Sequence, residues 1–181
     1  MMKNQDVSFN KDLQTERLIL RAPNLGDLET IFFMRTDVVL NQYIKRTPPI
    51  NFQEVETFIE ERLKDRQDGK AIYWVIALKD IPEQYIGAIS LWQFSKDRKK
   101  AEVGYDLHPN YQGKSIMSEA LKAVVGFGKQ ELALDRIEAF THKENKASIR
   151  LLNRNHFFLT ELRDPMVPTN CVFAIESPSA S

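Results

Sequence analysis

The amino-acid sequence predicts an α/β domain built on a mixed β-sheet. Two nearly continuous apolar segments, residues 72–78 and 85–91, are separated by a short polar turn, and residues 101–107 then alternate apolar and polar side chains. These three segments are expected to be strands of an antiparallel meander. Apolar residues between 117 and 132 recur at helical spacing, and residues 136–141 are again strand-like. This strand–helix–strand crossover predicts a parallel strand pair.

The composition indicates a soluble globular protein, and its 181 residues are about the length of one domain. Lysine plus arginine and aspartate plus glutamate both number 25, so no net charge draws the chain to nucleic acid or to an anionic membrane. Cys171 is the only cysteine, which excludes an intrachain disulfide and fits a reducing cytosol. The first residues are polar and no segment has the apolar length of a membrane span, so we expect a cytoplasmic protein without a signal peptide.

We expect a single domain for the whole chain. Its ordered core is predicted over about residues 15–175, between a short polar N-terminal tail and the Ser-rich segment 177–181. Residues 15–21 are expected to form the first strand. Asn24 and Asn51 are each followed three residues later by an acidic residue. This pattern is typical of a helix N-terminus and predicts the first two helices.

The C-terminal part of the chain is expected to add one helix and two strands. Asn145 is a good N-cap for a short helix. Residues 157–162 and 171–175 are expected to be short strands on either side of a loop that contains two prolines. The predicted order of elements is therefore strand, two helices, three strands, helix, strand, helix, two strands.

Residues 109–121, with the sequence PNYQGKSIMSEAL, connect the last strand of the meander to the crossover helix. A short loop that leads from a strand into a helix directs several unpaired backbone N–H groups, and the positive end of the helix dipole, toward one point. An anion, typically a phosphate, is the expected ligand of such a site. The alternative is a tight turn in which Gly113 is needed only for its backbone freedom.

Seven residues of this loop form a recognisable pattern. They are Pro109, Tyr111, Gly113, Lys114, Ser118, Glu119 and Ala120. The pattern resembles the acyl-CoA loop of the GNAT superfamily of N-acetyltransferases, in particular its RimJ/RimL-like branch, which acetylates the N-termini of ribosomal proteins. That branch typically has a second glycine where this chain has Ser115. A Cβ at this position takes room or strains the backbone.

Two further segments support the resemblance. The opening strand reads TERLILR, similar to the family's Thr-Glu-Arg-Leu-x-Leu-Arg, and residues 145–152 resemble its Asn-x-x-Ser-x-x-Leu-Leu helix start. His156 follows where the family commonly has glycine, so we expect an altered turn there. The resemblance extends over about residues 15–175 and implies the family's order of elements, which is the order predicted above.

The resemblance implies acetyl-CoA as the cosubstrate. The main chain of the central strand would pair with the pantetheine arm as an added strand does, and one of its N–H groups would face the thioester oxygen. The loop would hold the pyrophosphate, and Asn145 would contact the cofactor in addition to capping its helix. The implied cofactor-binding residues are Tyr105, Asp106 and Leu107 in the strand, Gln112, Gly113, Lys114, Ser115, Ile116 and Met117 in the loop, and Asn145.

Glu102 and Ser148 are the candidate catalytic residues, because acetyl transfer needs a neutral amine and a leaving thiolate. Glu102 alternates with Ala101 and Val103, so its side chain is expected on the opposite face of the strand, where it could accept the amine proton through water. The alternative is an ordinary solvated residue. Ser148 could donate a hydrogen bond to the sulfur, as the resemblance implies, or satisfy the first turn of its helix.

Other chemistries have less support in the sequence. Cys171 lies in a predicted terminal strand with no histidine nearby in sequence, which favours a buried thiol over a nucleophile. His108, His142 and His156 lack the spacing of metal ligands, so we expect no metal site.

We therefore expect a cytoplasmic, acetyl-CoA-dependent N-acetyltransferase, a monomer or homodimer, in which a primary amine attacks directly within a ternary complex. A protein N-terminus is the acceptor that the resemblance implies, and small amines or antibiotic-like molecules are the enzymatic alternative. The acceptor groove is predicted between the first two helices, residues 38–49 and residues 165–169. A non-catalytic acyl-CoA-binding or protein-interaction module is the alternative from another class. We expect no membrane or direct nucleic-acid contact.

Overall fold

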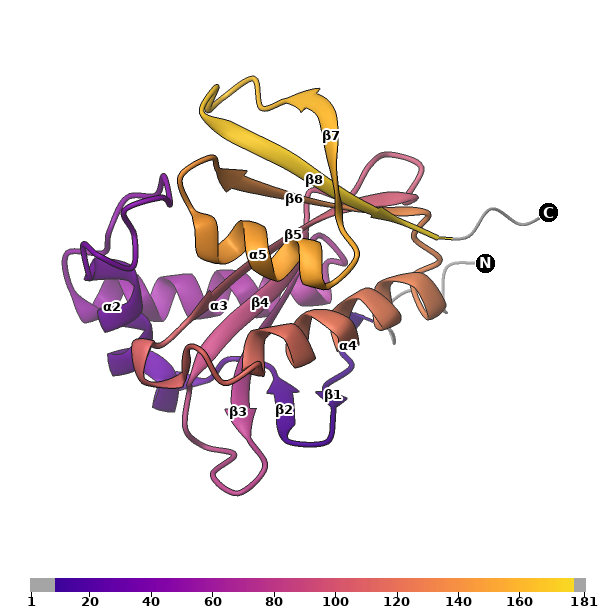
Figure 1. Cartoon of the computed structure of the whole chain (residues 1–181). Helices are drawn as coiled ribbons and strands as arrows, with labels where there is room; N and C mark the ends of the chain where they lie inside the picture. Colours follow the sequence, from indigo (N-terminus) through magenta and orange to yellow (C-terminus); the bar gives the residue numbers. More distant parts are fainter. Residues whose placement is uncertain (1–8, 178–181) are drawn as a thin grey trace.

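The computed structural model describes residues 9–177. Their strands form one mixed sheet of eight, in the order β1-β2-β3-β4-β5-β6-β8-β7 (Figure 1). All neighbouring strands are antiparallel except β5 and β6. The predicted mixed sheet, its meander and its parallel crossover are therefore confirmed. The strands are β1 (Leu13–Gln14), β2 (Leu18–Arg21), β3 (Ile72–Leu78), β4 (Gly87–Trp92), β5 (Lys100–Leu107), β6 (Arg136–His142), β7 (Phe158–Arg163) and β8 (Asn170–Glu176).

The beginning of the sheet differs from the prediction. The single strand expected over residues 15–21 is a small hairpin of β1 and β2, because Thr15 makes a turn between them. The Thr15 hydroxyl accepts a hydrogen bond from the N–H of Leu18 at 2.9 Å, and the Thr15 N–H donates to the Leu18 carbonyl at 3.0 Å. Phe9, ahead of the expected core, is already buried in it. The predicted tails fall largely on residues 1–8 and 178–181, which lie outside the described residues.

The helices begin at the asparagines that the sequence indicated. The Asn24 side chain accepts from the N–H of Gly26, Asn51 from that of Glu54, and Asn145 from that of Ser148. These side chains satisfy N–H groups that the helices leave unpaired. Asn24 starts the 3-10 turn Leu25–Asp27, which continues into α2 (Leu28–Thr36). Asn51 starts α3 (Phe52–Gln67), and Asn145 starts α5 (Lys146–Arg154). The remaining helix, α4 (Ile116–Gln130), follows the 3-10 turn Pro109–Tyr111.

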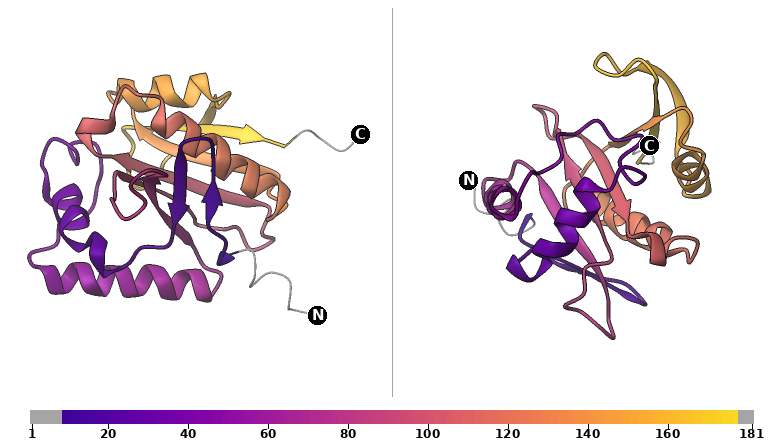
Figure 2. Two further views of the ribbon diagram at one scale, coloured as in Figure 1. Left: turned by 90° about the horizontal axis from the view of Figure 1, so that it is seen from below. Right: turned by 90° about the vertical axis from the view of Figure 1, so that its left-hand side faces the viewer.

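The sheet separates two layers of helices (Figure 2). On one face α2 and α3 pack on Val75 and Ala88, and on the other α4 and α5 pack on Trp74 and Val103. Because β3 is covered on both faces, its sequence is apolar at nearly every position rather than alternating. None of the helices in the described residues has the length and hydropathy needed to span a membrane.

Strands β5 and β6 pair over only three residues. Lys100, Ala101 and Glu102 lie opposite Arg136, Ile137 and Glu138. Beyond Glu102, β5 continues to Leu107 with β4 along its other edge, while β6 continues to His142 paired with β8. The two strands diverge (Figure 1), so the edge of β5 that faces β6 is without a partner strand over residues 103–107. We call this region the opening: Ser148 of α5 contacts Tyr105 of β5 there, and Tyr43, from the loop before α3, contacts His142 of β6.

Candidate active site

The loop before α4 has the conformation of an anion site. Gly113 has φ of +74° and Ser115 has φ of +59°, both in the left-handed region. Ser115 occupies the N-cap position of α4 but its side chain makes no capping hydrogen bond. The N–H groups of Ile116, Met117 and Ser118 therefore have no intrahelical or capping partner, and they lie at the positive end of the helix dipole. Ser115 keeps the backbone shape of a glycine at a cost of about 1 kcal/mol.

A cluster of polar contacts fixes this loop to the β1–β2 turn, and we call it the Arg17–Glu119 cluster. Glu119, in the first turn of α4, accepts from the Thr15 hydroxyl at 2.5 Å, from the Arg17 N–H at 2.9 Å and from Arg17 Nε at 2.7 Å. Arg17 Nη1 also donates to the Lys114 carbonyl at 3.2 Å. These residues belong to two of the segments that resembled the GNAT pattern, but nothing in the sequence indicated that they meet.

Glu102 lies where β5 and β6 begin to diverge, on the face away from Ala101 and Val103, as expected. Within residues 9–177 its carboxylate accepts no hydrogen bond from the protein. Burial first, and then the neighbouring carboxylates of Asp164 and Glu138, raise the pKa of Glu102 to about 7. A carboxylate with this pKa can accept and release a proton near neutral pH.

The two carboxylates beside Glu102 are themselves stabilised as anions. Glu138 accepts from Arg136 Nε at 2.6 Å. Although burial of Asp164 opposes it, hydrogen bonds from Asn170 and from two backbone N–H groups hold the pKa of Asp164 below its usual value. The lowered pKa of Asp164 keeps a negative charge beside Glu102, and this charge adds to burial in raising the pKa of Glu102.

Ser148 is on the opposite face of the opening from Glu102. Its hydroxyl is 2.8 Å from the hydroxyl of Tyr105 in β5, and its N–H donates to the Asn145 side chain at 3.1 Å. The Ser148 hydroxyl therefore links α5 to β5, and the first-turn N–H of Ser148 is satisfied by the Asn145 side chain. Burial raises the pKa of Tyr105 to about 12, so this phenol stays protonated. The role of its side chain was not predicted.

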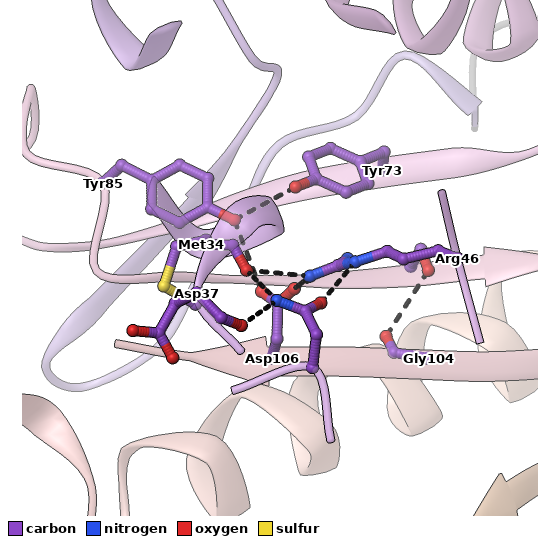
Figure 3. Close-up of polar contacts among 9 residues, drawn as sticks. Met34, Asp37, Arg46, Tyr73, Tyr85, Gly104 and Asp106 are labelled. Atoms are coloured by element: carbon purple, nitrogen blue, oxygen red, sulfur yellow. Dashed lines mark hydrogen bonds and ion pairs between the residues drawn. The ribbon is translucent and has the colours of Figure 1, made fainter. Parts of the chain in front are cut away.

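Asp106, predicted to act through its main chain, has its side chain in a buried polar network on the face of α2 and α3 (Figure 3). Both terminal nitrogens of Arg46 lie 3.4 Å from Asp106 Oδ2, and the Tyr85 hydroxyl donates to Oδ1 at 3.4 Å. Tyr73 in turn bonds to Tyr85 at 3.1 Å. Burial raises the pKa of Asp106, and the Arg46 guanidinium counteracts this effect. Arg46 and Asp106 are 60 positions apart in the sequence, so no local pattern predicts this pair.

The segment between α2 and α3 spans the ends of the diverging strands. Arg46 contacts Asp106 near the end of β5, and Tyr43 stacks on His142 at the end of β6, with ring centroids 5.2 Å apart. Lys45 lies close enough to Asp164 to affect its pKa. The loop 38–49 thus approaches the ends of both strands and also Asp164, which directly precedes residues 165–169. The acceptor groove between these loops remains a prediction.

The turn after α5 is not altered as expected. His156 has φ of +65°, the left-handed conformation for which glycine is favoured. Its N–H donates to the Asn153 carbonyl, and that of Phe157 donates to the Leu152 carbonyl at 3.0 Å. These two bonds are those of a Schellman C-cap, so the helix end is retained with a strained residue instead of being rebuilt.

The remaining candidates lie apart from this arrangement or have structural partners. Cys171 is half-buried in β8, opposite Thr141 of β6. His108 Nδ1 accepts from the Asn110 N–H, and His142 Nδ1 accepts from the Glu144 N–H. No group of three or more potential metal ligands occurs within residues 9–177.

The fold and this arrangement of loop, strand opening and carboxylate define an N-acetyltransferase. The family model described as Acetyltransferase (GNAT) domain matches residues 17–157, and the chain belongs to this family. The chain is 33% identical to the uncharacterized N-acetyltransferase p20 of Bacillus licheniformis over 145 aligned residues. The alignment covers 80% of this chain and 81% of the relative. The alternative of a non-catalytic module is therefore not retained.

Solved structures share the fold. RimL, a ribosomal protein α-N-acetyltransferase in complex with coenzyme A, superposes with a TM-score of 0.80 at 20% identity, over 92% of this chain and 98% of that chain. The microcin C7 self-immunity acetyltransferase MccE, in complex with acetyl-CoA and AMP, has a TM-score of 0.77 at 21% identity, over 90% and 94% of the two chains. The resemblance to the RimL-like acetyltransferases is thus confirmed in fold.

Proposed function

We propose that the protein transfers the acetyl group of acetyl-CoA to a primary amine, by direct attack in a ternary complex. The observation that carries the proposal is the parallel pairing of β5 and β6 over three residues only. It leaves β5 without a partner strand at Tyr105, Asp106 and Leu107, where the Leu107 carbonyl accepts from Gln112 Nε2 at 3.0 Å. An amide-containing chain such as pantetheine can pair with such a strand edge. The chain leads from the end of β5 at Leu107, through the loop, to the unpaired N–H groups at the start of α4 at Ile116.

The residues present fit the rest of this cosubstrate. Residues 112–117 form the loop whose left-handed positions expose backbone N–H groups to a pyrophosphate. Asn145 and Ser148 lie at the N-terminus of α5, on the other side of the opening. MccE and RimL, which share the fold, have been solved in complex with acetyl-CoA and with CoA. These facts support acetyl-CoA as the donor.

In the proposed reaction the amine nitrogen attacks the thioester carbonyl carbon, and the carbon–sulfur bond then breaks. Glu102, through water, takes the proton that the amine loses, which its pKa of about 7 permits at neutral pH. Ser148 donates a hydrogen bond to the departing thiolate, and its hydroxyl is oriented by Tyr105. A backbone N–H of β5 stabilises the developing oxyanion.

The favoured acceptor is a protein N-terminus. An N-terminal amine has a pKa of about 8, lower than that of a lysine, so it is deprotonated at a smaller cost. Support comes from a relative named ribosomal-protein-serine acetyltransferase in Escherichia coli, 33% identical over 93 residues, which are 51% of this chain and 50% of that protein. A small polyamine is the second candidate, since spermidine N(1)-acetyltransferase of Vibrio cholerae is 22% identical over 135 residues.

Calorimetry and turnover test the proposal together. The purified chain is titrated with acetyl-CoA, CoA and pantetheine, and acetylation is then measured on Ser-initiated peptides and on spermidine. We expect binding that depends on the pyrophosphate, and a kcat/KM on the best acceptor that falls about 100-fold in Glu102→Gln. Wild-type protein that fails to bind acetyl-CoA at millimolar concentration would contradict the proposed donor. Binding without acetylation of either acceptor class would contradict the proposed acceptors.

A further inference from the structure

The Arg17–Glu119 cluster joins the turn before β2 to the loop before α4. Glu119 holds the Arg17 guanidinium through Nε at 2.7 Å, while Nη1 of the same group donates to the Lys114 carbonyl at 3.2 Å. Glu119 also accepts from the Thr15 hydroxyl and the Arg17 N–H. Glu119 therefore fixes the guanidinium through Nε, and Nη1 binds one peptide group of the loop.

That peptide group joins Lys114 to Ser115. In a trans peptide the C=O and the following N–H point in opposite directions. When Arg17 binds the Lys114 carbonyl, the N–H of Ser115 must point away from the β1–β2 turn. The peptide orientation also sets the φ of Ser115, which is +59° and unfavourable for a residue with a Cβ. A serine without such a contact would favour a right-handed or extended backbone.

We propose that Arg17 is a positioning residue for the cosubstrate. It holds the Lys114–Ser115 peptide in the orientation that presents the Ser115 N–H to the pyrophosphate of CoA, and it does so at a position where no glycine makes that conformation easy. The inference rests on the proposed acetyl-CoA function. Because Glu119 neutralises Arg17 at 2.7 Å, Arg17 acts by orienting the loop and not by attracting phosphate as a free charge.

The test is a double-mutant cycle in the full-length protein. Arg17→Met keeps most of the side-chain length and removes all donors, and Ser115→Gly removes the strain. We expect Arg17→Met to weaken CoA binding about tenfold in calorimetry, the loss of one charged hydrogen bond. Pantetheine binding should not change. Adding Ser115→Gly to Arg17→Met should restore most of the CoA affinity, because glycine adopts the loop conformation unaided.

Lys11→Met is the matched control. Lys11 and Glu131 form an ion pair at 3.0 Å between the same N-terminal segment and the other end of α4, so its loss removes a comparable contact without touching the loop. CoA affinity should remain at the wild-type value. If Arg17→Met unfolds, Glu119→Gln removes the charge that fixes Arg17 and should weaken CoA binding in the same way, again with rescue by Ser115→Gly.

Two outcomes overturn the inference. One is wild-type CoA affinity in Arg17→Met and Glu119→Gln; the other is a loss of affinity that Ser115→Gly does not restore, which would assign Arg17 a general structural role. Either result leaves the proposed function intact as long as the wild-type protein binds CoA. Absence of CoA binding by the wild type contradicts the proposed function itself, and the inference with it.

Discussion

The hydroxyl groups of Tyr105 and Ser148 lie 2.8 Å apart and connect β5 to α5. They cross the region in which β5 has no partner strand, and the residues are 43 positions apart in the sequence. Ser148, the proposed hydrogen-bond donor to the departing sulfur, is thus held by a phenol whose pKa is raised to about 12 by burial.

Removal of the Tyr105 hydroxyl should lower turnover without affecting folding. We expect Tyr105→Phe to reduce kcat about tenfold, because Ser148 loses the partner that orients it. The double variant Tyr105→Phe/Ser148→Ala should be no slower than Ser148→Ala alone, since both changes act on one hydrogen bond. Steady-state kinetics at saturating acetyl-CoA measures both effects. Additive losses would show that Tyr105 acts independently of Ser148.

The pH dependence of activity should follow Glu102. With its pKa raised to about 7, the basic form of Glu102 is lost as the pH falls through 7. We expect wild-type kcat/KM to fall about tenfold per pH unit below 7. In Glu102→Gln this inflection should be gone, and any remaining pH dependence should follow the acceptor amine. A variant that keeps the same inflection would exclude Glu102 as the base.

The same residue should make stability depend on pH. The pKa of Glu102 is raised from 4.5 to about 7 in the folded protein, so the folded state binds the proton more tightly than the unfolded state. The free energy of unfolding contributed by this group is therefore present at low pH and is lost as the pH rises from 4.5 to 7. Glu102→Gln should be more stable than wild type at pH 8 and not at pH 4 in urea titrations. Glu60→Gln, an exposed residue of α3, is the control.

The strained turn after α5 predicts a stabilising substitution. Because His156 has φ of +65°, His156→Gly should raise the free energy of unfolding by about 1 kcal/mol. Arg154→Gly, two residues earlier within α5, should lower it by about 1 kcal/mol instead. Urea denaturation of both variants checks the pair. A loss of stability in His156→Gly would mean that the imidazole contributes more than the backbone strain costs.

Loss of Arg46 should destabilise the protein through Asp106. The pair is mostly buried, and removal of Arg46 leaves a carboxylate without its cationic partner. We expect Arg46→Met to cost about 2 kcal/mol, with part of this recovered in Arg46→Met/Asp106→Asn. Lys70→Met, which breaks an exposed ion pair with Asp68, should leave the unfolding curve unchanged. If Arg46→Met also leaves the unfolding curve unchanged, the network of Figure 3 does not stabilise the fold.

Local signals in the sequence predicted most of the fold. Caps at Asn24, Asn51 and Asn145 and the apolar runs of the strands depend on residues within one turn or one strand, and the structure confirms them. The hairpin at Thr15 was missed because its turn depends on one side-chain hydroxyl inside an otherwise strand-like segment.

The candidate site was predictable only where a contiguous segment supplies it. The loop at residues 112–117 could be recognised from its own residues. The contacts of Arg17 with Glu119 and of Arg46 with Asp106 join positions 102 and 60 residues apart, and no spacing rule relates them. The pKa of Glu102 depends on Asp164 and Glu138, which only the folded sheet brings close.

The three-residue pairing of β5 and β6 sets a limit on how this protein can evolve. The most direct way to strengthen the sheet would be to extend that ladder by a few more hydrogen bonds. Each added pair would close the edge on which acetyl-CoA is proposed to lie. Substitutions that stabilise the molecule without loss of activity must therefore arise elsewhere, at strained turns and helix ends. A homologue with a longer β5–β6 ladder would be more stable and less active.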